Sequence, residues 1–108
     1  MSFHLPDSIV TFFQVSNDRS TRLPRQCLTA GAAVHDEGQL YQGYGAIQEW
    51  LRETQRKYAY SIEPLTFTED GTSVHVQAKL IASFAGSPLQ LTYSFTLTGN
   101  KISSLEIH

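Results

Sequence analysis

Hydrophobic residues recur at helical spacing in the first half of the chain and at alternate positions in the second half. Ile9, Phe12 and Phe13 lie on one face of a predicted helix that ends near Asn17. The segment before them, residues 6–8, contains proline, aspartate and serine, which are typical of a helix start. The chain is therefore expected to open with an amphipathic helix.

The same spacing predicts two further helices before residue 60. A short one covers residues 23–30 and stops before Gly31, and a short strand over residues 32–36 follows it. The third helix is the best defined, because Ile47, Trp50 and Leu51 recur on one face. We interpret Trp50 as a packing residue or, alternatively, as part of the wall of a ligand pocket.

The remaining chain alternates with period two and predicts four strands. They cover residues 62–68, 73–84, 89–97 and 102–107, and short turns that contain glycine separate them. Such short connections favour an antiparallel meander. Three helices followed by a strongly bent, mostly antiparallel sheet give an α+β fold. If the sheet curls around the helices, it forms a cone that is open at one end.

Length and composition limit the classes of function. The chain has 108 residues, the usual size of one domain, and we treat residues 1–108 as a single domain. A net charge of −2 argues against nucleic acid as the main partner, because phosphate binding needs a basic surface. No apolar run is long enough to span a membrane, and the N-terminus lacks the pattern of a secretion signal. These features predict a cytoplasmic protein with no membrane partner.

Residues that commonly hold metals or cofactors form no recognisable pattern. Cys27 is the only cysteine, so no intrachain disulfide and no thiolate metal site is expected. The four histidines, His4, His35, His75 and His108, lack the spacing of metal ligands. A glycine-rich phosphate loop and a nucleotide-binding fingerprint are also absent. We therefore predict neither a metal nor a cofactor.

Five segments of the chain together resemble the nuclear transport factor 2-like superfamily, and more narrowly its SnoaL-like and ketosteroid-isomerase-like domains. In chain order they are Ser16-Asn17-Asp18, Val34-His35-Asp36-Glu37-Gly38, residues 43–50, residues 84–88 and residues 99–107. Their order and spacing carry the resemblance, which covers nearly the whole chain. It implies a cone-shaped α+β barrel with a deep pocket, commonly dimeric through the sheet.

The resemblance also places candidate chemistry. Asp36 falls where ketosteroid isomerases carry the general base, which moves a proton between carbons next to a carbonyl. In those enzymes a tyrosine and a protonated aspartic acid hold the developing enolate. Their positions fall here on Phe12, which has no donor, and near Tyr93, which has one. The key aspartate of SnoaL-like cyclases falls within residues 92–94, where this chain has none. Asp36 and Tyr93 are therefore the catalytic candidates.

Mostly apolar residues around Asp36 are expected to line the pocket. The candidate ligand-binding residues are Phe12, Val34, His35, Trp50, Phe84, Leu91, Tyr93 and Phe95. Two alternatives stay open: His35 is either a base at the pocket or an outward strand residue, and Asp36 with Glu37 is either an acid–base cluster or a solvated turn. Three tyrosines near the third helix either rim the pocket or, the interpretation we favour, pack with their hydroxyls at the surface: Tyr41, Tyr58 and Tyr60.

The leading functional hypothesis is a domain that binds a small apolar or carbonyl-bearing molecule. Proton transfer of an isomerase, cyclase or dehydratase type through Asp36 is compatible with the pattern. The alternative is a non-catalytic scaffold that associates with itself or with another protein. The outer strand face, which carries His75, Gln77 and Lys79, is mild enough to pack against a second copy, so a homodimer through the sheet is predicted.

Overall fold

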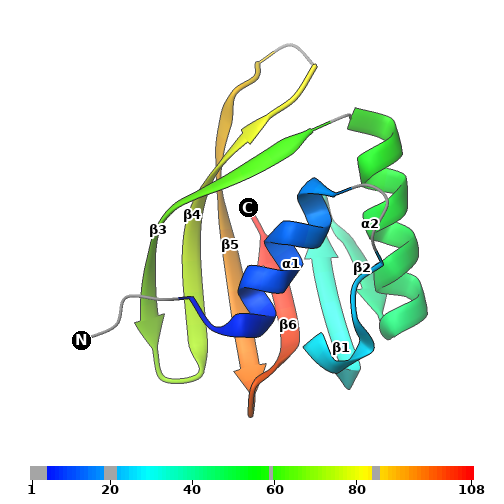
Figure 1. The fold of residues 1–108 in the computed structure, drawn as a ribbon, viewed down its shortest axis with the longest axis vertical. Coiled ribbons are helices and arrows are strands. Elements are labelled where there is room, and N and C mark those ends of the chain that lie inside the picture. Colours follow the sequence, from blue (N-terminus) through cyan, green and yellow to red (C-terminus); the bar gives the residue numbers. More distant parts are fainter. Residues whose placement is uncertain (1–4, 19–21, 59, 84–85) are drawn as a thin grey trace.

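The computed structural model of the chain describes residues 5–18, 22–58, 60–83 and 86–108. It has an α+β fold with two α-helices and a six-stranded mixed sheet (Figure 1). The elements in chain order are α1 (Asp7–Asn17), a 3-10 turn η1 (Arg25–Cys27), β1 (Leu28–Asp36), β2 (Gln39–Gln42), α2 (Tyr44–Tyr58), β3 (Ser61–Asp70), β4 (Ser73–Ile81), β5 (Leu89–Thr98) and β6 (Lys101–Ile107).

The strands follow the order β2-β1-β6-β5-β4-β3 across the sheet. The run from β3 to β6 is the predicted antiparallel meander, and the pairing of Val76 with Tyr93 and of Phe95 with Leu105 confirms it. The sheet continues from β6 to β1 by a parallel pairing, and β1 pairs with β2 as an antiparallel hairpin. Because β1 and β6 are parallel, their C-terminal ends lie side by side, with His35 paired to Glu106.

The prediction of three helices is wrong, since the segment 23–30 forms no α-helix. It holds the short η1 turn and then enters β1 at Leu28. Leu28 pairs with Ile102 and Ala33 pairs with Ser104, with a register irregularity between them. Pairing with β6 satisfies the backbone of this segment and overrides its local apolar pattern, which alone does not separate a short helix from a strand.

Strand β2 was not predicted, and it is short, polar and largely exposed. It forms because the two-residue turn before it folds the chain back onto β1, so Asp36 pairs with Gln39 and Val34 pairs with Tyr41. The strand predicted to reach residue 84 is observed as far as Ile81. Phe84 itself lies outside the described residues.

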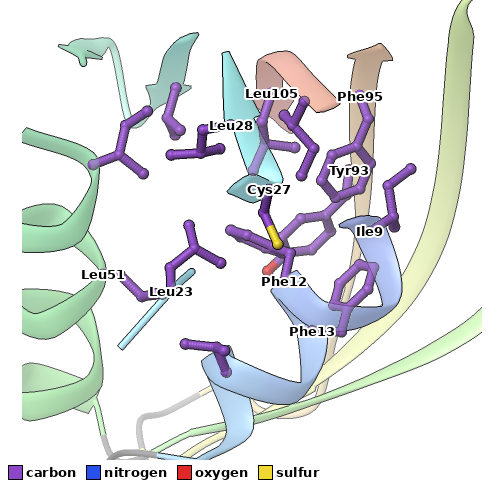
Figure 2. Close-up of a cluster of buried hydrophobic side chains, with 14 of the residues drawn as sticks. Ile9, Phe12, Phe13, Leu23, Cys27, Leu28, Leu51, Tyr93, Phe95 and Leu105 are labelled. Carbon is purple, nitrogen blue, oxygen red and sulfur yellow. The ribbon is translucent and has the colours of Figure 1, made fainter. Parts of the chain in front are cut away.

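Both helices bury one face against the concave side of the sheet. Ile9, Phe12 and Phe13 on α1 point toward Tyr93 and Phe95 on β5 (Figure 2). Four of these rings contact one another and form what we call the aromatic core: Phe12, Phe13, Tyr93 and Phe95. Four of its contacts are edge-to-face, with centroids 5.3 to 5.8 Å apart, and the Tyr93 and Phe95 rings stack with centroids 6.5 Å apart. Ring quadrupoles favour both arrangements over a face-to-face sandwich.

Side-chain amides, one on a buried residue and one on an exposed residue, fix the C-terminal end of α1. Gln55 on α2 donates from Nε2 to the backbone carbonyls of Val15 and Ser16, at 2.9 and 3.2 Å. Asn17 forms two hydrogen bonds with the backbone of Ile62. Asn17 Nδ2 donates to the Ile62 carbonyl, and the Ile62 N–H donates to Asn17 Oδ1. These bonds satisfy carbonyls that a helix end leaves open, and they tie α1 to α2 and β3.

In the described part of the chain, neither helix combines the length and the apolar character needed to cross a bilayer.

Candidate functional site

A cavity of about 470 Å³ opens between the two helices and one end of the sheet. This volume lies within the range of roughly 300–1,000 Å³ that is usual for small-molecule sites. Its wall is mainly aromatic and aliphatic, with a few polar groups. The lining residues are Phe12, Ser16, Asp36, Glu37, Trp50, Thr54, Tyr60, Ile62, Leu80, Leu89, Leu91, Tyr93, Ile107 and His108.

The turn between β1 and β2 determines where Asp36 lies. Glu37 and Gly38 are the two turn residues, and their φ angles of 52° and 77° are both positive. Two-residue hairpins of the I′ class require positive φ at both positions, which glycine adopts at little cost. Asp36 is therefore the last strand residue before a tight reversal, and its half-buried side chain lies at the cavity wall.

Trp50 holds the Asp36 carboxylate. Its indole Nε1 donates a hydrogen bond of 3.0 Å to Asp36 Oδ2. The indole stacks on Phe12, with ring centroids 6.4 Å apart and planes 14° apart. It also contacts the Tyr41 ring, with centroids 6.0 Å apart. The carboxylate is thus oriented by a neutral donor, and the solvated-turn interpretation of Asp36 is incomplete. Trp50 acts both as a packing residue and as a wall of the cavity.

Tyr93 brings a phenol to the same cavity from β5. The residue is only 4% exposed. Burial raises the pKa of the Tyr93 hydroxyl well above its ordinary value, and the nearby Tyr60 phenol and the Asp36 carboxylate raise that pKa further. Tyr93 therefore keeps its proton at neutral pH and remains a hydrogen-bond donor.

Further polar residues complete the wall. Tyr60 is buried and lines the cavity, which agrees with the pocket-rim alternative and not with a surface hydroxyl. Ser16 and Thr54 were not predicted. Ser16 and Thr54 reach the cavity from α1 and α2, and the Thr54 hydroxyl donates to the Trp50 carbonyl at 2.8 Å. Their spacing in the sequence partly indicates this position. Ser16 is four residues after Phe12, and Thr54 is four residues after Trp50, so each pair lies on one helix face.

The predicted site residues divide into three groups. Those that line the cavity are Phe12, Asp36, Trp50, Leu91 and Tyr93. Val34 and Phe95 do not line it, because their side chains are buried in the hydrophobic core. His35 is exposed and does not line it either, since strand alternation turns it away from Val34. Phe84 is outside the described residues, and so is the side chain of Tyr58.

A second cavity of about 410 Å³ shares part of this wall. Four residues line both cavities: Asp36, Glu37, Trp50 and Thr54. The second cavity adds Tyr41 from β2 and the outward side chains of α2, among them Glu49 and Glu53. The Asp36–Trp50 pair therefore separates an apolar interior from an acidic outer groove.

Within residues 5–18, 22–58, 60–83 and 86–108, no group of three or more His, Cys, Asp or Glu side chains is placed to hold a metal ion. Cys27 is buried, and burial raises the pKa of its thiol, which disfavours the reactive thiolate.

Known structures share this architecture. A protein from Sinorhizobium meliloti described as a "putative polyketide cyclase" is 38% identical, with a TM-score of 0.87 over 96% of this chain and 95% of that chain. An NTF2-like protein of unknown function from Cytophaga hutchinsonii is 12% identical, with a TM-score of 0.77 over 100% and 91%. A ketosteroid isomerase-like fold from Catenulispora acidiphila, in complex with trimethylamine, is 14% identical, with a TM-score of 0.78 over 97% and 86%.

No protein-family model matches the sequence, and no curated protein matches it. The likeness to the Sinorhizobium protein is high in both identity and coverage. The chain therefore belongs to the nuclear transport factor 2-like superfamily, among its SnoaL-like and ketosteroid-isomerase-like domains.

Proposed function

We propose that the protein binds a small, largely apolar carbonyl compound in the 470 Å³ cavity and moves a proton on it through Asp36. One observation carries this proposal: a carboxylate oriented by Trp50 shares an apolar cavity with the buried, protonated phenol of Tyr93. A base and a hydrogen-bond donor in one mainly apolar cavity are the two groups that enolisation requires.

The proposed step is proton abstraction next to a carbonyl. Asp36 takes the proton from the carbon beside the carbonyl, and the electron pair of the broken C–H bond moves onto the carbonyl oxygen as an enolate. Tyr93 donates a hydrogen bond to that oxygen, where negative charge develops. The Asp36 carboxyl group then returns the proton to carbon, so the step needs no cofactor or second reactant.

The relatives support this reaction class without identifying the substrate. The Sinorhizobium protein is described as a "putative polyketide cyclase". Ring closure of the aldol type would begin with the same loss of a proton beside a carbonyl. The Catenulispora structure contains a small organic molecule, trimethylamine, on the same fold. Both observations favour a small-molecule site in this chain.

Hydrogen–deuterium exchange tests the proposal. 2-Tetralone, a bicyclic ketone with an acidic C–H beside its carbonyl, is dissolved in D₂O with the protein, and loss of the C1 proton signal is followed by NMR. We expect protein-dependent exchange that saturates with ketone concentration. Asp36→Asn should lower its rate by about 100- to 10,000-fold, the usual contribution of a general base.

The Asp36→Asn variant preserves the shape of the site, because the asparagine carbonyl can still accept the bond from Trp50. The matched control is Glu63→Gln, which removes one exposed carboxylate of β3 that lines neither of the two cavities beside Asp36. Its exchange rate should equal that of the wild type. Equal rates for the wild type and Asp36→Asn would overturn the proposal.

The outer face of the sheet supports a second candidate function, self-association. On β4 and β5 the outward residues other than Lys79 are uncharged or histidine, and several already bond to one another. His75 Nδ1 lies 2.9 Å from Ser94 Oγ, and the Thr92 hydroxyl donates to Gln77 at 3.1 Å. A second copy can cover such a face without burying many unpaired charges. If the exchange assay shows no protein-dependent rate, a dimeric scaffold is the function that this face favours.

A further inference from the structure

The C-terminal turn of α1 presents a hydroxyl that the fold does not use. Ser16 is 1% exposed, and its Oγ has no hydrogen-bond partner among the described residues. Ser16 also lines the 470 Å³ cavity, as does Phe12 one helical turn earlier. A buried polar group without a partner is unusual in a folded protein and calls for an explanation.

The backbone around Ser16 is held in place on both sides. Gln55 Nε2 donates to its carbonyl, and the neighbouring Asn17 side chain bonds the backbone of Ile62 twice. These partners come from α2 and β3, so the α1 backbone cannot shift freely to bring the hydroxyl to another acceptor. The side chain keeps rotation about its own Cα–Cβ bond.

Folding alone would favour alanine at this position. Alanine has the higher helix propensity and leaves no buried hydroxyl to desolvate. A helical serine usually bonds the carbonyl four residues earlier, which here belongs to Phe12, and the Ser16 hydroxyl does not do so. The hydroxyl therefore weakens the fold. Ser16 borders the cavity while its Oγ is buried, and rotation about the Cα–Cβ bond is the motion that would turn the hydroxyl toward a ligand.

We propose that Ser16 is a second polar contact for the ligand, an inference that rests on the proposed function. The ligand class that fits is an apolar molecule with two oxygen groups. The carbonyl oxygen would lie at Tyr93, beside the Asp36 carboxylate, and a second hydroxyl or carbonyl would bond Ser16 Oγ. Because a serine hydroxyl both donates and accepts, either kind of group is suitable.

Paired probes test this inference. Affinity is measured by calorimetry for 2-tetralone and for its 6-hydroxy and 7-hydroxy derivatives, which add one hydroxyl at the far end of the ring system. We expect one hydroxyketone to bind the wild type roughly tenfold more tightly than the ketone, the value of about one net hydrogen bond. In Ser16→Ala that advantage should disappear, while the affinity for 2-tetralone stays the same.

Ser8→Ala is the matched control. Ser8 also lies on α1, is buried and has an unpartnered Oγ, but it does not line the cavity. Both variants should unfold at a temperature no lower than that of the wild type. Only Ser16→Ala should lose the preference for the hydroxyketone, so a general effect of removing a buried hydroxyl is separated from a binding effect.

The outcomes distinguish this inference from the proposal on which it rests. If 2-tetralone binds but neither hydroxyketone binds more tightly, or if Ser16→Ala keeps the preference, the role of Ser16 is refuted and the proposed function stands. If none of the three probes binds, both the proposed function and the role of Ser16 are refuted.

Discussion

Helix α1 faces two environments that differ in how completely they are filled and satisfied. On one side, Phe12 and Phe13 pack into the aromatic core against Phe95, with ring centroids 5.6 and 5.8 Å apart. On the other, Phe12 and Ser16 border a cavity of about 470 Å³. The aromatic core contains no polar atom except the Tyr93 hydroxyl, whereas the cavity wall includes Asp36 and an unpartnered serine hydroxyl.

The difference separates what packing explains from what it does not. Rings in edge-to-face contact are what packing alone would select. A half-buried carboxylate and an unpartnered hydroxyl are what packing would remove, and the proposed binding function accounts for both beside one cavity. Tyr93 belongs to both regions, because its ring contacts Phe13 at 5.3 Å while the residue lines the cavity.

The largest effect should come from opening the aromatic core. Phe95 is fully buried, and Phe95→Ala should lower the free energy of unfolding by about 3–5 kcal/mol, since it removes a buried ring and leaves a void. Phe67→Ala is the control, because Phe67 is only partly buried on the edge strand β3 and should cost clearly less. Urea denaturation measures both. Equal losses would show that the aromatic core is packed no more tightly than the edge of the sheet.

A smaller effect should appear at alkaline pH, through Tyr93. Its pKa is raised in the folded protein, so the folded state keeps a proton that the unfolded chain releases above pH 10, the ordinary tyrosine value. The contribution of the protonated Tyr93 to the free energy of unfolding is fully present below pH 10. It is lost as the pH rises from 10 toward the raised pKa of Tyr93. The free energy of unfolding should therefore fall by about 1.4 kcal/mol per pH unit from this group alone.

Tyr93→Phe isolates that contribution. The variant removes the titrating hydroxyl and keeps the ring in the aromatic core, so its stability should fall less steeply above pH 10 than that of the wild type. Tyr41→Phe, at a half-buried ring of β2, should leave the slope unchanged. Urea titrations at a series of alkaline pH values give the slopes. Parallel wild-type and Tyr93→Phe curves would show that the Tyr93 phenol is not buried from solvent.

Periodicity in the sequence was sufficient to predict most of the fold. Helix α2 follows from Ile47, Trp50 and Leu51, and the β3–β6 meander follows from strict alternation over long strands. The segment 23–30 was misjudged because a short apolar run fits a helix or a strand equally well, and only its pairing with β6 decides. Strand β2 has too little apolar character to be recognised without the turn that places it beside β1.

The positions of single candidate residues were predictable, and the contacts made where several elements meet were not. The family resemblance placed Asp36 and Tyr93, and both line the cavity. Ser16 was missed and Tyr60 was left between two interpretations, because the positions of both depend on how β3 and α1 are tied together by Asn17. Phe95 was assigned to the pocket because alternation gives the face of a strand but not the depth at which a side chain lies.

The indole of Trp50 gives the most direct test of the central claim, that a small carbonyl compound occupies the cavity beside Asp36. Trp50 is the only tryptophan, so its ¹⁵N–¹H signal is unambiguous, and its Nε1–H is the group that bonds Asp36. When 2-tetralone is added, we predict that this signal shifts to saturation, and that tetralin, which lacks the carbonyl, binds more weakly. An indole signal that stays unchanged at saturating ketone would contradict the account.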